Sequence, residues 1–158
     1  MKVTVIRHAN AQDVSSTGRD GDRSLLKKGR EQAMSVAALM MRGGDLPDVV
    51  VSSPLLRCVE TSKIITDRLN LPAVLTERRL SCGMQPHEAM DVLRDYQEYE
   101  HVCLVGHEPD LSGLIASMLG LTAHLVKMKK ASVAHFSQVQ LSTGRGLLEF
   151  LIPPSLHF

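Results

Sequence analysis

The chain has 158 residues, of which 44% are hydrophobic and 22% charged, and its 18 basic and 17 acidic side chains give a formal net charge of +1. This length predicts one domain over residues 1–158, and the hydrophobic fraction excludes a disordered chain. The balanced charge and the aromatic content of 3% argue against the basic, stacking surface that nucleic-acid-binding proteins carry.

Along the chain, short apolar or β-branched runs alternate with segments whose apolar residues recur at helical spacing. The predicted strands cover residues 3–6, 48–51, 73–75, 101–105, 132–140 and 146–151. The predicted helices cover residues 26–42, 55–69, 86–96 and 109–119, and a polar loop covers residues 12–22. Met34, Met40 and Met41 lie at helical spacing and are expected in the core. This order predicts an α/β fold with three layers, α/β/α, around a mostly parallel central sheet with one antiparallel strand.

Signals for targeting and metal binding are missing from the sequence. Only a short apolar run precedes Arg7, so no signal peptide is predicted, and no apolar stretch approaches the roughly 20 residues of a membrane helix. The cysteines at positions 58, 82 and 103 form no CxxC pair, which favours reduced thiols. The seven histidines include no HxxxH or HxH pair. We therefore expect a cytoplasmic protein with no membrane partner and no bound metal.

Polar side chains follow three of the predicted parallel strands. Arg7 and His8 come directly after the first strand, residues 52–57 after the second, and His107 after the fourth. The carboxyl ends of parallel strands meet at one edge of a sheet, where ligands bind. Two guanidinium groups can neutralise a phosphoryl dianion, because their planar donors match phosphate oxygens. A neutral imidazole can attack phosphorus when its other ring nitrogen donates to a fixed carbonyl.

Three segments of the chain resemble those of the histidine phosphatase superfamily, which has the phosphoglycerate mutase-like fold. They are Arg7-His8-Ala9, the run over residues 52–61 and the run over residues 105–109. The short chain and residues 106–112 look most like the compact branch of SixA-type phosphohistidine phosphatases. The resemblance implies that His8 is the nucleophile, that Arg7 and Arg57 hold the phosphoryl oxygens, and that His107 donates to these oxygens.

The resemblance and the residues themselves suggest three further positions for the site. Arg23, which precedes Leu25 and Gly29, occupies the place of a loop arginine that approaches the pocket in the compact branch. Asn10 could donate to phosphate, although turn chemistry explains an Asn there equally well. Glu108 is a candidate acid for the leaving group, or else a charge that complements a helix N-terminus. The remaining histidines are assigned no role: His87, His101, His124, His135 and His157.

We expect a metal-independent phosphatase without a cofactor, working through a covalent phosphohistidine intermediate. The expected partner is a protein that carries phosphohistidine, because little sequence remains for a cap over a small metabolite. Two alternatives stay open: a phosphatase of a small phosphorylated metabolite or phosphopeptide, and a phosphate-binding regulatory module without turnover. Binding alone would need only the arginines, so the presence of His8 and His107 favours catalysis. The oligomeric state is left open.

Overall fold

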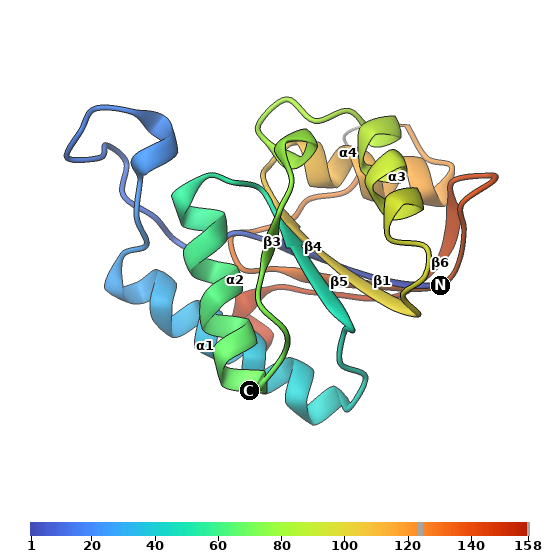
Figure 1. Cartoon of the computed structure of the whole chain (residues 1–158), viewed down its shortest axis with the longest axis horizontal. Coiled ribbons are helices and arrows are strands. Elements are labelled where there is room, and N and C mark those ends of the chain that lie inside the picture. The colour runs from blue at the N-terminus through green and yellow to red at the C-terminus, as the bar shows by residue number, and fades with distance from the viewer. Residues whose placement is uncertain (123–124, 158) are drawn as a thin grey trace.

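In the computed structural model, which describes residues 1–122 and 125–157, six strands form one sheet in the order β3-β2-β4-β1-β5-β6 (Figure 1). The strands are β1 (Lys2–Arg7), β2 (Val49–Ser52), β3 (Leu75–Thr76), β4 (His101–Gly106), β5 (Val133–Gln140) and β6 (Arg145–Ile152). Strands β1 to β4 pair in parallel, whereas β5 is antiparallel to both of its neighbours, β1 and β6. The predicted α/β class and the mostly parallel sheet with one antiparallel strand are therefore confirmed.

Helices cover both faces of this sheet. In the described ranges they are α1 (Lys27–Gly43), α2 (Leu56–Leu69), α3 (Pro86–Asp95) and α4 (Asp110–Leu119), with short 3-10 turns η1 (Asp20–Asp22), η2 (Arg78–Leu80) and η3 (Pro154–Leu156). One core cluster lies under α1 and α2 and a second lies under α3 and α4, which gives the three layers in Figure 1. None of these helices combines the length and the apolar character that crossing a membrane requires.

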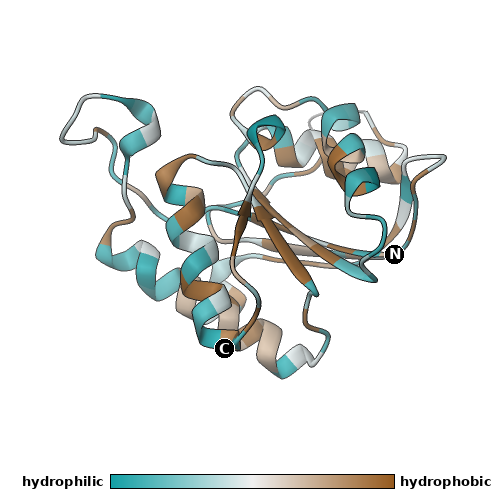
Figure 2. Ribbon diagram, viewed as in Figure 1, coloured by the Kyte–Doolittle hydropathy of each residue, from teal (hydrophilic) through white to brown (hydrophobic). Residues whose placement is uncertain are grey.

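The central strand β4 shows why this sequence forms a covered parallel sheet. All six of its residues are buried, and such near-continuous apolar runs are typical of strands that are packed on both faces. Val102 and Leu104 face the α3–α4 cluster, whereas Cys103 and Val105 face the α1–α2 cluster. Figure 2 shows the central strands in the colour of hydrophobic residues, the residue type that burial on both faces requires.

Two details of the sequence-based analysis are wrong. Only Met40 of the three methionines is in the core, because Met34 and Met41 are 45% and 55% exposed. These two lie seven residues apart and share the outer face of α1, whereas Met40 is rotated by about 100° from Met41. The third strand, β3, is also shorter and later than expected, with two exposed residues that pair only with β2 at the sheet edge.

The register of the sheet brings three strand ends to one edge. Arg7 at the end of β1 pairs with Gly106 at the end of β4, and Ser52 at the end of β2 pairs with Val105. The residues that follow these strands therefore start from neighbouring positions.

Candidate active site

The two histidines singled out from the sequence lie side by side at this edge. The backbone N–H of His8 donates to the carbonyl of Gly106 at 3.1 Å, so the segment after β1 is fixed against the end of β4. His107 directly follows Gly106, and the ring centroids of His8 and His107 are 5.4 Å apart. Both side chains are buried, with exposed fractions of 6% and 2%.

The His8 ring is held in one orientation by its own backbone. Its Nδ1 lies 2.8 Å from the carbonyl oxygen of Ala9, and because a carbonyl only accepts, Nδ1 carries the proton and donates. The backbone N–H of Ala9 in turn donates to Oγ1 of Thr61 in α2 at 3.1 Å, which fixes this carbonyl. The lone pair of a neutral His8 is then on Nε2, the arrangement expected for a nucleophilic imidazole.

The surroundings of His8 keep its imidazole neutral. The pKa of His8 is lowered to about 3, mainly by burial and also by electrostatic contributions from His107 and from the charges of Arg57 and Arg7, against the opposing effect of the hydrogen bond to Ala9. These charges affect the pKa of His8 because both arginines lie near it. At neutral pH the ring is therefore uncharged, as a nucleophilic imidazole has to be, and lies in the electrostatic field of two guanidinium groups.

His107 is held by Ser53, a residue for which the sequence alone predicted no role. The Nε2 of His107 lies 2.8 Å from Oγ of Ser53, and the same hydroxyl oxygen accepts from the backbone N–H of Leu55 at 3.3 Å. The sulfur of Cys58 packs 3.5 Å from this Nε2. Burial lowers the pKa of His107 to about 4, with a further contribution from Arg57. The available signal for Ser53 was its place directly after β2, matching that of Arg7 and His8 after β1.

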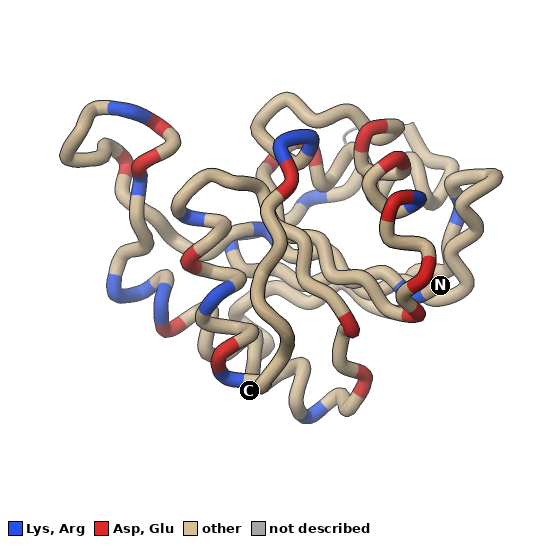
Figure 3. Tube along the Cα trace, viewed as in Figure 1, with Lys and Arg blue, Asp and Glu red and all other residues tan. Residues whose placement is uncertain are grey.

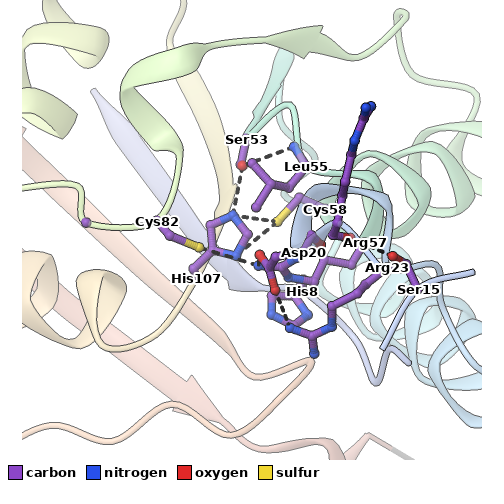
Figure 4. A network of polar contacts seen from close by, with 12 residues as sticks. His8, Ser15, Asp20, Arg23, Ser53, Leu55, Arg57, Cys58, Cys82 and His107 are labelled. Atoms are coloured by element: carbon purple, nitrogen blue, oxygen red, sulfur yellow. Dashed lines mark hydrogen bonds and ion pairs between the residues drawn. The ribbon is translucent and has the colours of Figure 1, made fainter. Parts of the chain in front are cut away.

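Arg57 lies in the first turn of α2 and is 3% exposed. Its Nη1 donates to the backbone carbonyl of Asp20 at 3.0 Å, and its Nη2 donates to Oδ2 of Asp20 at 3.1 Å and to the sulfur of Cys82 at 3.4 Å (Figure 4). Arg23 donates to the other carboxylate oxygen of Asp20 at 2.8 Å. The structure thus brings Arg23 next to Arg57, as expected, but through an aspartate that was missed because a polar loop carries no periodicity.

Arg7 approaches the site from the end of β1. Its Nη1 donates to the carbonyl of Met128 at 2.8 Å, and burial lowers its pKa while nearby Glu108 opposes this. The Nε atoms of Arg7 and Arg57 are buried and have no hydrogen-bond partner in the described part of the chain. Buried polar groups are almost always paired, so unpaired N–H groups of this kind are available to donate to a bound anion.

The two remaining candidates are engaged in local contacts. The side-chain oxygen of Asn10 accepts from Nζ of Lys130 at 3.1 Å. Glu108 accepts from the backbone N–H of Ser112 at 3.0 Å and also from its hydroxyl, so it caps the start of α4. This contact matches the helix N-terminus alternative for Glu108.

The other histidines are placed as follows. His101 begins β4, at the opposite end of the strand from the site, and shares the hydroxyl of Thr4 with His135. His157 lies against Ser35 of α1, His87 lies in α3, and His124 is outside the described residues. Within the described ranges, no three His, Cys, Asp or Glu side chains converge as they do around a metal ion.

A groove of about 670 Å³ lies next to the catalytic candidates rather than at them. Its walls include Glu108, Pro109 and Asp110 at the start of α4, residues 84–86, and residues 126–127. None of His8, Arg7, Arg57 or His107 lines it. The groove is much larger than a phosphoryl group, and Glu108 connects it to the neighbourhood of His107.

Comparisons with known proteins agree with this geometry. Residues 3–81 match the family model described as the histidine phosphatase superfamily (branch 1). An uncharacterized protein of Picosynechococcus is 28% identical over 140 residues, covering 84% of this chain and 82% of that protein. The structure of the protein histidine phosphatase SixA complexed with tungstate superposes with a TM-score of 0.88 at 22% identity, over 98% of each chain. The α-ribazole phosphatase from Shigella flexneri gives a TM-score of 0.76 at 19% identity, over 98% of this chain and 97% of that one.

Proposed function

Because this chain belongs to the histidine phosphatase superfamily and is a phosphatase, we propose that it hydrolyses protein phosphohistidine through a phosphohistidine formed on its own His8. The single observation that carries this proposal is the hydrogen bond from Nδ1 of His8 to the carbonyl of Ala9. It leaves Nε2 as the nucleophilic atom, in a buried cluster with His107 and near two arginines.

The proposed reaction has two steps. In the first, Nε2 of His8 attacks phosphorus and the bond between phosphorus and the substrate nitrogen breaks. The leaving imidazole, protonated on its other ring nitrogen, keeps the electron pair and departs neutral. In the second, water attacks phosphorus, the bond to Nε2 breaks, and inorganic phosphate leaves with His8 restored. Arg7 and Arg57 hold the equatorial oxygens, whose negative charge is spread in the transition state, and His107 donates to them. Arg23 and Asn10 are proposed to support phosphate binding at the margin of this site.

Two observations support a protein as the substrate. The chain shares its fold along nearly its whole length with SixA, a protein histidine phosphatase. The groove beside Glu108 offers room for a protein surface next to the reacting phosphoryl group. The same fold also occurs in an α-ribazole phosphatase, so a small phosphate ester is the competing substrate class.

The experiment mixes the protein with a larger protein that carries ³²P-labelled phosphohistidine, stops the reaction with alkali within milliseconds, and separates the two by electrophoresis. Wild type should acquire acid-labile, alkali-stable label transiently. His8→Ala should acquire none and should lose turnover by a factor on the order of 10³ or more. His87→Ala, at an exposed position in α3, is the matched control and should behave as wild type.

Retained turnover in His8→Ala would contradict the covalent mechanism. Faster turnover of a small ester such as p-nitrophenyl phosphate than of the phosphohistidine protein would instead favour the metabolite alternative. Binding of inorganic phosphate with no turnover of either substrate would identify a binding module.

A further inference from the structure

The segment over residues 12–24, between β1 and α1, places a carboxylate on the arginines of the site. The Asp20 side chain is 60% exposed, yet it forms ion pairs with Arg57, whose side chain is 4% exposed, and with Arg23, at 21%. Its backbone carbonyl accepts from Arg57 as well. Both terminal nitrogens of the buried Arg57 guanidinium therefore donate to this one surface residue.

A bound phosphoryl group would need the same donors. A guanidinium fork matches carboxylate and phosphate oxygens in the same way, and two anions on one fork repel each other. The negative charge of Asp20 also acts on His107, where it opposes the lowering of the pKa. In Figure 4 the Asp20 carboxylate is drawn beside the His8 and His107 rings. The carboxylate thus occupies the donors of Arg57 that the proposed function assigns to phosphoryl oxygens.

The segment that carries Asp20 is weakly attached to the core. No residue of η1 is buried, and the hydrogen bonds that join its Asp20 to α2 are those from Arg57, whereas the bond from Thr17 to Asp22 lies within the loop itself. Figure 3 shows basic and acidic residues next to one another in this loop, beside the start of α2. Segments with few buried apolar contacts open at low free-energy cost.

We propose that Asp20 is an internal competitor for the phosphoryl group, which leaves Arg57 when phosphorylated substrate binds and returns when inorganic phosphate departs. This inference rests on the proposed function, because it assumes that Arg57 binds phosphate. Asp20 then weakens the binding of substrate and of inorganic phosphate by the same factor, so it raises the KM of the substrate and the Ki of phosphate together. Asp20 thus changes the affinity of the site for phosphate and takes no part in the bond-making and bond-breaking steps.

The test measures binding of inorganic phosphate by isothermal titration calorimetry at constant ionic strength, for wild type, Asp20→Asn and Asp22→Asn. The Asp20→Asn variant should bind phosphate roughly 10-fold more tightly, since hydrogen bonds between charged groups no longer have to be broken. Inhibition of turnover by phosphate should strengthen by the same factor. Asp22→Asn removes the same charge from the same loop, but Asp22 accepts from Thr17 and not from Arg57, so its affinity should stay within about 2-fold of wild type.

A fourth protein, Arg57→Ala, separates the two ways to fail. If Arg57→Ala loses phosphate binding while Asp20→Asn binds as wild type or more weakly, competition by Asp20 is wrong and the phosphate site stands. If wild type and Arg57→Ala bind phosphate equally, or neither binds it, the phosphoryl site of the proposed function is wrong, and the role of Asp20 falls with it. Equal tightening in Asp20→Asn and Asp22→Asn would show a general charge effect and would also overturn the proposal.

Discussion

At the scale of single residues, Ser53 decides how His107 is held. Its hydroxyl lies 2.8 Å from the buried Nε2 of His107, whose other described contact is the sulfur of Cys58 at 3.5 Å. Ser53→Ala leaves this nitrogen with only the weak sulfur contact of Cys58, and an inadequately paired buried polar group costs about 1–3 kcal/mol. We therefore expect kcat to fall about 10-fold or more while KM changes little, because the ring loses its orientation.

The matched control is Ser52→Ala, one residue earlier and equally buried, whose hydroxyl donates to the carbonyl of Ser53 and not to His107. Steady-state kinetics with a phosphohistidine protein, together with the melting temperature, compare the two. Ser53→Thr retains the hydroxyl and should recover most of the lost kcat. If both alanine variants lose activity in proportion to their stability, Ser53 has only a structural role.

The residues at the sheet edge differ in how far the sequence alone could identify them. Arg7, His8 and His107 could be found because each lies at the end of a buried strand or directly after it, and Arg57 because it lies in a recognisable run after β2. Asp20 could not be found in this way. Its position depends on how an aperiodic loop folds back onto α2, which is a tertiary contact without a local signal.

At the scale of secondary-structure elements, the backbone of helix α1 packs closely against the loop that follows His8. A Cβ added at Gly29 would lie 1.9 Å from the carbonyl oxygen of Asn10, an atom that also accepts from the backbone N–H of Leu26 at 3.0 Å. The helical periodicity of α1 could be predicted, but this close approach between backbones could not, because it depends on how the helix packs.

Replacement of Gly29 by alanine should therefore move α1 or the loop that carries His8. Overpacking of this kind destabilises proteins by about 1–3 kcal/mol, and we expect a loss near the upper end because the clash is with backbone. Urea unfolding gives the stability, and kcat should fall as Nε2 of His8 is displaced. Gly43→Ala, at the last residue of α1 with no atom within 4 Å of the added Cβ, should leave both unchanged or slightly raise stability. Wild-type stability in Gly29→Ala would show that the contact relaxes freely.

At the scale of the whole molecule, the sequence predicted the fold better than its details. Long buried strands such as β4 and amphipathic helices such as α2 have strong periodic signals, so their order and the parallel sheet could be deduced. The edge strand β3 has two exposed residues and almost no signal, and its position came out wrong. The near-zero net charge likewise hid a local excess, because Arg7, Arg57 and Arg23 collect at one edge while charges of both signs cover the surface (Figure 3).

The molecule as a whole should lose stability on mild acidification because several of its histidines are kept neutral by burial. Burial lowers the pKa of five of them: His8, His101, His107, His135 and His157. A pKa that is lower in the folded than in the unfolded chain means that the unfolded chain takes up protons first. Stability is then fully present above about pH 6.5 and is lost as the pH falls from there toward the folded pKa.

For His8 and His107, with folded pKa values of about 3 and 4, the whole interval from pH 6.5 to pH 5 lies in this window. Each should cost about 2 kcal/mol at pH 5, so the free energy of unfolding should fall by roughly 4 kcal/mol from pH 7 to pH 5 for these two alone. Urea unfolding at pH 7, 6 and 5 measures this, and His8→Asn should lose about 2 kcal/mol less than wild type over the interval. The control His87→Gln, at an exposed position, should reproduce the wild-type pH dependence. Two outcomes would show that burial does not keep His8 neutral: a stability that is constant between pH 7 and pH 5, or a pH dependence in His8→Asn equal to that of wild type. The neutral state that a nucleophilic His8 requires would then need another explanation.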